Sequence, residues 1–367
     1  MTVVLTGGTG FVGSRLCSEL LHRTDGPVVC LVRGEDAVTA ERRMRTALGE
    51  VDEEAAASPR LRTVAADLSA DRFGLGKDVY RQLAQEAEAV YHSGASVHLA
   101  APYERVAPVN LGGTRRVIDF CTTGAAKHLH HVSTLGVFLA ARETGLDRVD
   151  ESTPPSLQTC GPFGYLRTKV EAENAVASAA ADKDVSATVY RPGLVLADSR
   201  DGAAPANDFT TCVIAAAIVT GCCPTAMGSL PASTVDHTAQ AIAALSLAPG
   251  ASRSVYHVMR PEPLPMRELF DRARGHGHRI REVSAQQWRE ALYAHRENPW
   301  ARAAYALDIC TYTLGLAPDR RPPAVDGATT AQATAQAGVS VPDTGAAYFD
   351  RLLNRLHQDH GETLIHS

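Results

Sequence analysis

Lysine is scarce in this sequence. Only four lysines occur among the 36 basic residues, at positions 77, 127, 169 and 183, and the others are arginines. With ten tyrosines and so few lysines in 367 residues, a lysine four places after a tyrosine is uncommon by chance. The pair Tyr165 and Lys169 has this spacing. The rarity weakens the alternative, an incidental lysine on a surface helix, without excluding it.

Long apolar runs are also absent. No stretch reaches the 18 or so residues that a membrane-spanning helix needs, so we expect no membrane association. The N-terminus lacks the basic segment followed by an apolar one that marks a secretory signal, because a strand-like run begins almost at Met1. We therefore expect a cytoplasmic protein. The net charge of −5 predicts no nucleic-acid partner.

Metal-binding and disulfide patterns are missing as well. The eight cysteines form no C-x-x-C pair, and most lie in apolar stretches, which predicts buried, reduced thiols. Histidines cluster at 128, 130 and 131 and at 276 and 278, without cysteine or carboxylate partners at zinc spacing. We expect no metal site.

The first half of the chain alternates strand-like and helix-like segments. Apolar, β-branched runs lie at 2–6, 28–32, 62–65, 88–92, 128–133 and 186–191, and helical patterns lie at 11–23, 36–49, 78–87, 103–123 and 164–181. This alternation predicts an α/β fold with a doubly wound parallel sheet, and apolar strands fit a sheet covered on both faces. A run at 254–258 is predicted to return to the sheet as a seventh strand.

The pattern changes after about residue 195, where prolines and glycines punctuate shorter segments. Helices are predicted at 266–275, 285–295 and about 346–358, and the Ala-, Thr- and Pro-rich stretch 321–345 is predicted to be a surface connection. We expect a dinucleotide-binding domain at 1–200 plus 254–258. Residues 201–253 and 259–367 would form a smaller, mostly helical substrate lobe.

Three glycines follow the first strand at the spacing G-x-x-G-x-x-G. Gly7 would permit the tight turn, Gly10 would let the backbone approach a pyrophosphate, and Gly13 would let the helix pack closely on the sheet. The motif is weak alone, but here it follows a strand and opens a helix, as a Rossmann-type site requires. The alternative is a glycine-rich turn without a ligand.

The second strand ends at Arg33, where a cofactor with a free ribose 2′-hydroxyl would meet a carboxylate. An arginine suits a 2′-phosphate instead, and Arg43 on the next helix would add a second positive charge. NADPH is therefore favoured over NADH. The alternative is that Arg33 only pairs with Glu35 or Asp36.

Three further strand ends carry candidate site residues. Asp67 and Leu68 follow the third strand and suit an adenine. Small residues follow the fourth strand and would let the cofactor pass, namely Ser93, Gly94 and Ala95. After the fifth strand, Thr134 would face the helix that carries Tyr165 and Lys169, which share one helical face. The alternative for Thr134 is a hydroxyl that caps its own turn.

The chain resembles the extended short-chain dehydrogenase/reductases, and within them the thioester reductase domains of nonribosomal peptide and polyketide synthetases and of carboxylic acid reductases. The resemblance covers residues 2 to about 315. The glycine turn and the Tyr-Lys pair are shared by the whole superfamily. More specific to the thioester branch are segments 31–33 (Leu-Val-Arg), 191–193 (Arg-Pro-Gly) and 198–202 (Asp-Ser-Arg-Asp-Gly).

The resemblance implies a role for each matching residue. Thr134 and Tyr165 would hydrogen-bond the substrate carbonyl oxygen, and Lys169 would hold the nicotinamide ribose and lower the pKa of Tyr165. The implied NADPH-binding set is Thr6, Gly7, Thr9, Gly10, Phe11, Val12, Gly13, Arg33, Arg43, Asp67, Leu68, Ser93, Gly94, Ala95, Ser133, Tyr165, Lys169, Pro192 and Gly193.

The implied reaction is NADPH-dependent reduction of an acyl or peptidyl thioester to an aldehyde, and possibly on to the alcohol. The implied partner is an acyl or peptidyl carrier protein that holds the thioester on phosphopantetheine, and a monomer is expected. The chain departs from the family in its short N-terminus and in Val170, where an aromatic residue is usual. A free-standing enzyme and a domain of a larger synthetase both stay open.

Two other functions fit the same fold. A nucleotide-sugar epimerase or dehydratase would retain NAD, and Arg33 in place of a carboxylate speaks against it. A non-catalytic NAD(P)-binding sensor would have lost the chemistry, whereas Thr134, Tyr165 and Lys169 are intact. The acyl group is not readable from the lobe sequence.

Overall fold

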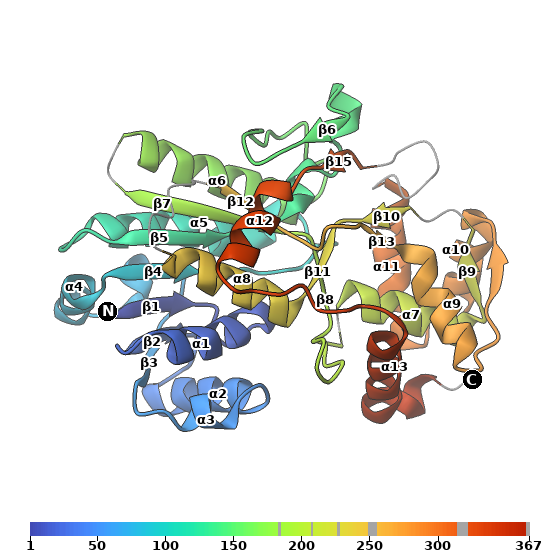
Figure 1. Cartoon of the computed structure of the whole chain (residues 1–367), viewed down its shortest axis with the longest axis horizontal. Helices are drawn as coiled ribbons and strands as arrows, with labels where there is room; N and C mark the ends of the chain where they lie inside the picture. The colour runs from blue at the N-terminus through green and yellow to red at the C-terminus, as the bar shows by residue number, and fades with distance from the viewer. Residues whose placement is uncertain (183–184, 207, 226–227, 249–254, 314–321, 365–367) are drawn as a thin grey trace.

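The computed structural model of the chain describes residues 1–182, 185–206, 208–225, 228–248, 255–313 and 322–364, without the side chains of 308–313. A seven-stranded parallel sheet of order β12-β7-β5-β4-β1-β2-β3 forms its larger part (Figure 1). Its strands are β1 (Val3–Thr6), β2 (Val28–Val32), β3 (Leu61–Ala65), β4 (Ala89–His92), β5 (His128–Val132), β7 (Ser186–Pro192) and β12 (Val255–Val258). The predicted fold class, including the returning seventh strand over its described residues, is confirmed.

Helices cover both faces of this sheet. One apolar layer joins it to α1 (Phe11–Arg23), α2 (Ala37–Gly49), α3 (Glu53–Ala57), α8 (Val235–Leu247) and α12 (Ala328–Gln336). The opposite layer joins it to α4 (Lys77–Glu86), α5 (Tyr103–Thr122) and α6 (Gly164–Ala181). The central strands β1, β2 and β4 are buried on both faces, as their uninterrupted apolar runs require.

A smaller, mostly helical lobe lies beside the sheet, on the right in Figure 1. Its separate apolar core joins α7 (Phe209–Thr220), α9 (Met266–Gly275), α10 (Ala285–Ala294), α11 (Pro299–Thr313) and α13 (Ala346–His360). Four short strand pairs lie outside the main sheet among the described residues: β8 (Leu194–Leu196) with β11 (Ala232–Thr234), β9 (Cys222–Pro224) with β14 (Arg281–Val283), β10 (Ser229–Leu230) with β13 (Leu264–Pro265), and β6 (Arg148–Val149) with β15 (Ala324–Val325). The described part of the chain also contains four 3-10 turns: η1 (Asp71–Gly74), η2 (Leu135–Phe138), η3 (Ala141–Thr144) and η4 (Gly361–Leu364).

The predicted surface connection at 321–345 was wrong for much of its length. Over the described part, 322–345, the chain forms β15 and α12, and α12 packs against β12 and α8. Its buried face consists of Thr330 and Thr334 rather than large apolar residues. The Thr334 hydroxyl donates to Thr330 O at 3.0 Å, so polar side chains bury without orphaned groups. The sequence of α12 therefore lacks the apolar residues at helical spacing from which a helix could have been predicted.

The division into two domains stays a proposal. Helices α8 and α12 lie within the ranges assigned to the lobe, yet both pack against the sheet layer (Figure 1).

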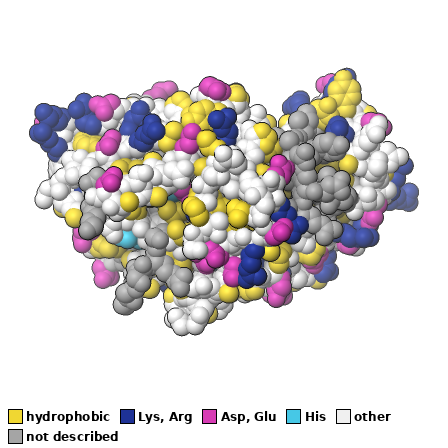
Figure 2. All heavy atoms as spheres, turned by 90° about the horizontal axis from the view of Figure 1, so that it is seen from above, with side chains coloured by type: hydrophobic (Ala, Val, Ile, Leu, Met, Phe, Trp, Pro, Cys, Tyr) yellow, Lys and Arg dark blue, Asp and Glu magenta, His cyan; other side chains and the backbone are white. Residues whose placement is uncertain are grey.

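In the face shown in Figure 2, acidic and basic side chains are interspersed. Among the described residues, no helix is long and apolar enough to cross a membrane.

Candidate functional site

The turn after β1 is closed around two glycines. Gly7 has a φ of +77°, and a Cβ on it would lie 2.6 Å from Gly94 N. A Cβ on Gly13 would lie 2.0 Å from Gly7 O. Gly10 N donates to Gly7 O at 2.9 Å. Side chains are therefore excluded where the turn, the start of α1 and the end of β4 meet, which leaves a cradle of bare backbone.

Helix α1 begins at this cradle. Its cap residue is Gly10, which offers no side chain to the first N–H groups, and the first turn holds no acidic residue. Phe11 and Val12 are half-buried in that turn, and Thr9 is half-buried just before it. A 13-residue helix with free N–H groups and a bare backbone turn fits a pyrophosphate. The residues present thus fit a dinucleotide cofactor.

The ends of β1 and β4 are tied together beneath the cradle. Thr6 is paired in register with His92, and its Oγ1 lies 2.7 Å from His92 Nδ1 and accepts from Gly94 N at 3.2 Å. Thr6 is 1% exposed, and its hydroxyl supports the turn; its predicted contact with the cofactor stays a prediction. Ser93 and Ala95 flank Gly94 at the same edge and are half-buried.

The end of β2 gathers positive charge. Arg33 and Arg43 are both exposed, and the Arg43 guanidinium donates to the backbone oxygen of Arg33. Asp36 caps α2 by accepting from Thr39 N at 2.7 Å. Among the described residues, no ion pair joins Arg33 to Asp36 or Glu35. The alternative in which Arg33 is neutralised locally is not what the structure shows.

Asp67 and Leu68 lie beside the fourth strand's end. A Cβ on Gly94 would lie 2.6 Å from Leu68 Cδ1, which brings the ends of β3 and β4 into contact. Hydrogen bonds from Ser69 hold the pKa of Asp67 below its ordinary value, and Arg33 acts in the same direction. The carboxylate is therefore ionised and faces the arginine end of the site.

Thr134 follows the end of β5, the last residue of that strand contacts Lys169, and Tyr165 lies one turn before Lys169 on α6. Tyr165 packs in one apolar cluster with Leu135 and Leu166, and a Cβ on Gly136 would lie 2.7 Å from Leu166 Cδ2 and 3.3 Å from Thr134 Oγ1. Thr134 Oγ1 accepts from Gly136 N at 3.1 Å. The hydroxyl thus caps its own turn, as the alternative had it, and its proton still remains available to donate.

Burial is the main cause of the pKa shifts of Tyr165 and Lys169. It raises the pKa of Tyr165, and no hydrogen bond joins the Tyr165 hydroxyl to another described residue. The phenol is therefore protonated at neutral pH and free to donate, although the predicted lowering of its pKa by Lys169 is not seen. Burial lowers the pKa of Lys169 to about 8, against the effect of Glu173. Lys169 Nζ donates to Val132 O at 2.8 Å.

The remaining predicted residues have structural partners. Ser133 donates from its hydroxyl to Glu173. Pro192 ends β7 in register with Val258, and Gly193 N donates to Val258 O at 3.0 Å. The roles of these residues toward a cofactor stay predictions.

Sequence reasoning missed two groups that the structure places at the site. Glu173 and Arg191 form a buried ion pair behind Ser133. Asn110 on α5 accepts from Ser96 N at 2.7 Å and donates to Thr168 Oγ1 at 3.0 Å, and so ties the loop after β4 to α6. A carboxylate four residues after Lys169 was the available signal for the first group.

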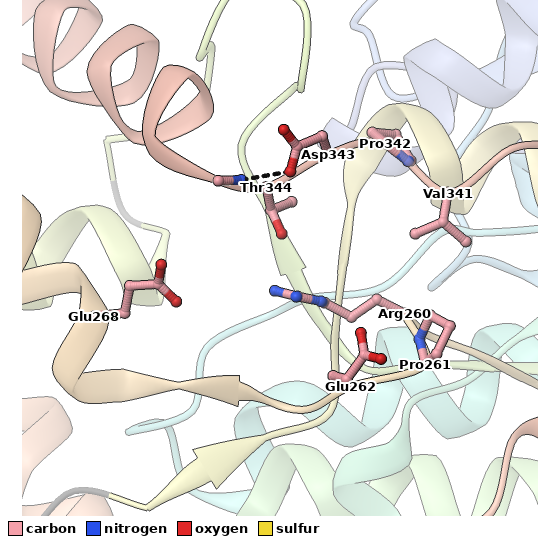
Figure 3. A pocket seen from close by; sticks show the side chains of 9 residues that line it. Arg260, Pro261, Glu262, Glu268, Val341, Pro342, Asp343 and Thr344 are labelled. Carbon is pink, nitrogen blue, oxygen red and sulfur yellow. Dashed lines mark hydrogen bonds between the residues drawn. The ribbon is translucent and has the colours of Figure 1, made fainter.

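A separate pocket of about 280 Å³ lies where the carboxyl end of β12 meets the lobe, and its lining contains none of the three predicted catalytic residues. Figure 3 shows the Arg260 side chain extending into it. Arg260 Nη1 is buried and has no hydrogen-bond partner among the described residues. The pocket is lined by Arg260, Pro261, Glu262, Glu268, Val341, Pro342, Asp343, Thr344 and Gly345.

No cluster of three metal-ligating side chains occurs among the described residues. The seven described cysteines are free and buried, and Cys310 lies outside the described side chains. Burial raises the pKa of Cys121 and of Cys212 to about 12. Such thiols are not ionised near neutral pH, so they are poor nucleophiles.

Residues 5–242 match the family described as male sterility protein. The chain is 31% identical over 291 residues to a linear gramicidin synthase polypeptide of Brevibacillus parabrevis, covering 79% of this chain and 6% of the synthase. It is 33% identical over 310 residues to the non-canonical nonribosomal peptide synthetase FrzA of Cladobotryum sp, covering 80% of this chain and 30% of that protein. The chain thus spans a minor part of these relatives.

Among solved structures, the terminal R domain from the myxalamid PKS-NRPS biosynthetic pathway is 29% identical, with a TM-score of 0.89 over 98% of this chain and 90% of that one. UDP-glucuronic acid 4-epimerase from Bacillus cereus shares the fold at 13% identity and a TM-score of 0.68, with 98% of both chains covered. The epimerase alternative is therefore more distant. The chain belongs to the male sterility protein family and is an oxidoreductase of the thioester reductase branch of the extended short-chain dehydrogenase/reductases, with a nicotinamide cofactor.

Proposed function

We propose that the chain uses NADPH to reduce an acyl or peptidyl thioester, held on the phosphopantetheine arm of a carrier protein, to an aldehyde. The observation that carries the proposal is the buried, protonated Tyr165 hydroxyl, which has no hydrogen-bond partner among the described residues and belongs to the apolar cluster that includes Leu135, next to Thr134 in the chain. The relatives support it, because those named above are peptide synthetases and a terminal R domain.

The cofactor would lie along the carboxyl edge of the sheet. The start of α1 would hold its pyrophosphate, Arg33 and Arg43 its 2′-phosphate, Asp67 and Leu68 its adenine, and Lys169 its nicotinamide ribose. When bound, NADPH supplies the hydride that the thioester carbon accepts.

The chain's own residues act on the substrate oxygen. As the carbonyl carbon becomes tetrahedral, negative charge develops on its oxygen, and the hydroxyls of Tyr165 and Thr134 donate hydrogen bonds to it. Tyr165 transfers its proton to that oxygen. The hydroxyl of the resulting hemithioacetal returns its proton to Tyr165 as the carbon–sulfur bond breaks. The thiolate of the arm leaves and takes up a proton from solvent, so that a thiol and an aldehyde remain. No cysteine nucleophile is needed.

Replacing Arg33 by alanine is expected to weaken NADPH much more than NADH, because only NADPH carries the 2′-phosphate. A lost charge-assisted contact costs roughly 1.5–3 kcal/mol, so KM for NADPH should rise about 10- to 100-fold. Steady-state kinetics with both cofactors measure this. Arg42→Ala is the control, because Arg42 is exposed on α2 next to Arg43 but lies about 100° around the helix axis from it. Equal losses with both cofactors would contradict the NADPH assignment.

The proposed reaction is tested with a substrate panel. With NADPH, the protein should oxidise cofactor in the presence of carrier-bound or pantetheine acyl thioesters, and more efficiently than with the matching free aldehydes. A thiol-reactive dye should detect one thiol released per thioester reduced. UDP- and dTDP-sugars serve as the comparison. Turnover of a sugar nucleotide without any thioester-dependent oxidation would favour the epimerase alternative instead.

A further inference from the structure

A buried ion pair lies one helical turn beyond Lys169. The side chains of Glu173 and Arg191 are 4% and 3% exposed. Arg191 donates from Nε and Nη2 to Glu173 Oε2 at 3.0 and 2.8 Å. Its Nη1 donates to Thr153 O at 3.2 Å and lies 3.2 Å from His257 Nε2. All three guanidinium nitrogens are thus engaged, and the carboxylate is fixed in one orientation.

The same carboxylate touches the strand end that carries the predicted catalytic groups. Ser133 donates from its hydroxyl to Glu173 Oε1. On one side of Ser133, the oxygen of Val132 accepts from Lys169 Nζ at 2.8 Å. On the other side is Thr134. Glu173 therefore contacts Ser133, which lies between the residue whose oxygen accepts from Lys169 and Thr134, which carries the second hydroxyl of the site.

Glu173 also carries the charge opposite to that of Lys169. The two residues are four apart on α6 and so share a face of the helix. Burial makes the charged form of Lys169 unfavourable, and the Glu173 carboxylate acts against that effect. No other nearby charge raises the pKa of the Lys169 ammonium. Removing the Glu173 carboxylate would leave the effect of burial on the Lys169 ammonium without this compensation.

We propose that Glu173 is a positioning residue of the reduction: through Ser133 it holds the end of β5, it places a negative charge one helical turn from Lys169, and Arg191 holds the carboxylate in place. This inference rests on the proposed function, because it takes Lys169 and Thr134 as parts of the catalytic site. It assigns a function to the buried pair of Glu173 and Arg191, which contacts neither the predicted substrate position nor the glycine cradle.

The other titratable groups around Lys169 do not change charge near neutral pH. His131 on β5 and His92 on β4 face it, and burial lowers the pKa of both, that of His92 to about 3. Burial likewise lowers the pKa of His257 on β12, behind Arg191, and it raises that of Tyr165 on α6. A change of activity between pH 7 and 9 is therefore assigned to Lys169.

The test compares Glu173→Gln with Glu171→Gln. Glu171 is a matched control on the same helix, because it also accepts a hydrogen bond, from the Tyr103 hydroxyl at 2.5 Å, but lies away from Ser133. Two readouts are measured from pH 6 to 10: kcat/KM with a pantetheine thioester, and the dissociation constant of NADPH. The second needs no thioester turnover, so a failure of the proposed function leaves the inference testable.

In Glu173→Gln, kcat/KM is expected to fall about 10- to 100-fold, since small displacements of catalytic groups have effects of this size. The alkaline loss of kcat/KM and of NADPH affinity should move to lower pH by about one unit. Because an unpaired Arg191 can destabilise the fold, the double variant Glu173→Leu, Arg191→Leu is measured as well. The pH profile of the double variant should stay displaced to lower pH relative to that of the unaltered chain. Profiles in Glu173→Gln that match Glu171→Gln, or a wild-type profile in the double variant, would overturn the inference.

Discussion

Replacing Tyr165 by phenylalanine is expected to lower kcat by about 10²- to 10⁴-fold, the usual effect of losing a general acid. The phenyl ring remains, so its packing in the cluster with Leu135, Leu166 and Val170 is kept. NADPH affinity should therefore stay near that of the unaltered chain. Rapid-mix kinetics give kcat, and a fluorescence titration gives the dissociation constant.

Tyr190→Phe is the control for this experiment. Tyr190 is also a buried phenol, but it packs in the apolar layer with α1 and α8 and contacts His130 Nδ1 through its hydroxyl at 3.1 Å. Its removal should change stability more than kcat. A Tyr165→Phe enzyme with undiminished turnover would remove Tyr165 from the mechanism.

The second large effect is expected from Gly13→Ala. The new Cβ would lie 2.0 Å from Gly7 O, a backbone atom that has no side-chain freedom to move away. The turn or the start of α1 must shift, and overpacking of this kind costs roughly 1–3 kcal/mol. If that cost falls on the bound state, NADPH affinity drops by up to about 100-fold.

Gly49→Ala provides the matched control, because Gly49 is also helical and its Cβ would meet only Ala56 Cβ at 3.9 Å. Alanine favours helix, so this variant should bind NADPH normally and unfold at the same or a slightly higher temperature. Titration of both variants, with thermal unfolding alongside, separates cofactor loss from general instability. Normal NADPH binding by Gly13→Ala would show that the cradle is not the pyrophosphate site.

The parallel sheet could be predicted because local signals agree with the tertiary structure. Apolar runs such as 28–32 form strands buried on both faces, and the helix predicted at 164–181 has those bounds in the structure. The sequence could predict that Tyr165 and Thr134 lie at the same edge of the sheet, because the ends of parallel strands and the starts of the following helices share that edge.

Helices that are buried all round could not be predicted in this way. In α7 every residue from Thr210 to Val219 is buried, so no polar stripe marks its period. Helix α12 fails for the opposite reason, because its buried positions are threonines. The Glu173–Arg191 pair was missed because its two residues lie on different elements. The sequence shows that Glu173 shares a helical face with Lys169, but only the folded structure shows that Arg191 on β7 lies beside it.

Isotope transfer tests the proposed reaction most directly. The protein is mixed with NADPH deuterated at both C4 positions and an acyl pantetheine thioester, and the aldehyde is trapped as an oxime for mass spectrometry. If Tyr165 and Thr134 activate the thioester carbonyl for hydride transfer, the aldehyde should carry one deuterium, bonded to its carbonyl carbon. An aldehyde without deuterium, or deuterium lost to water, would contradict NADPH-dependent reduction of the thioester.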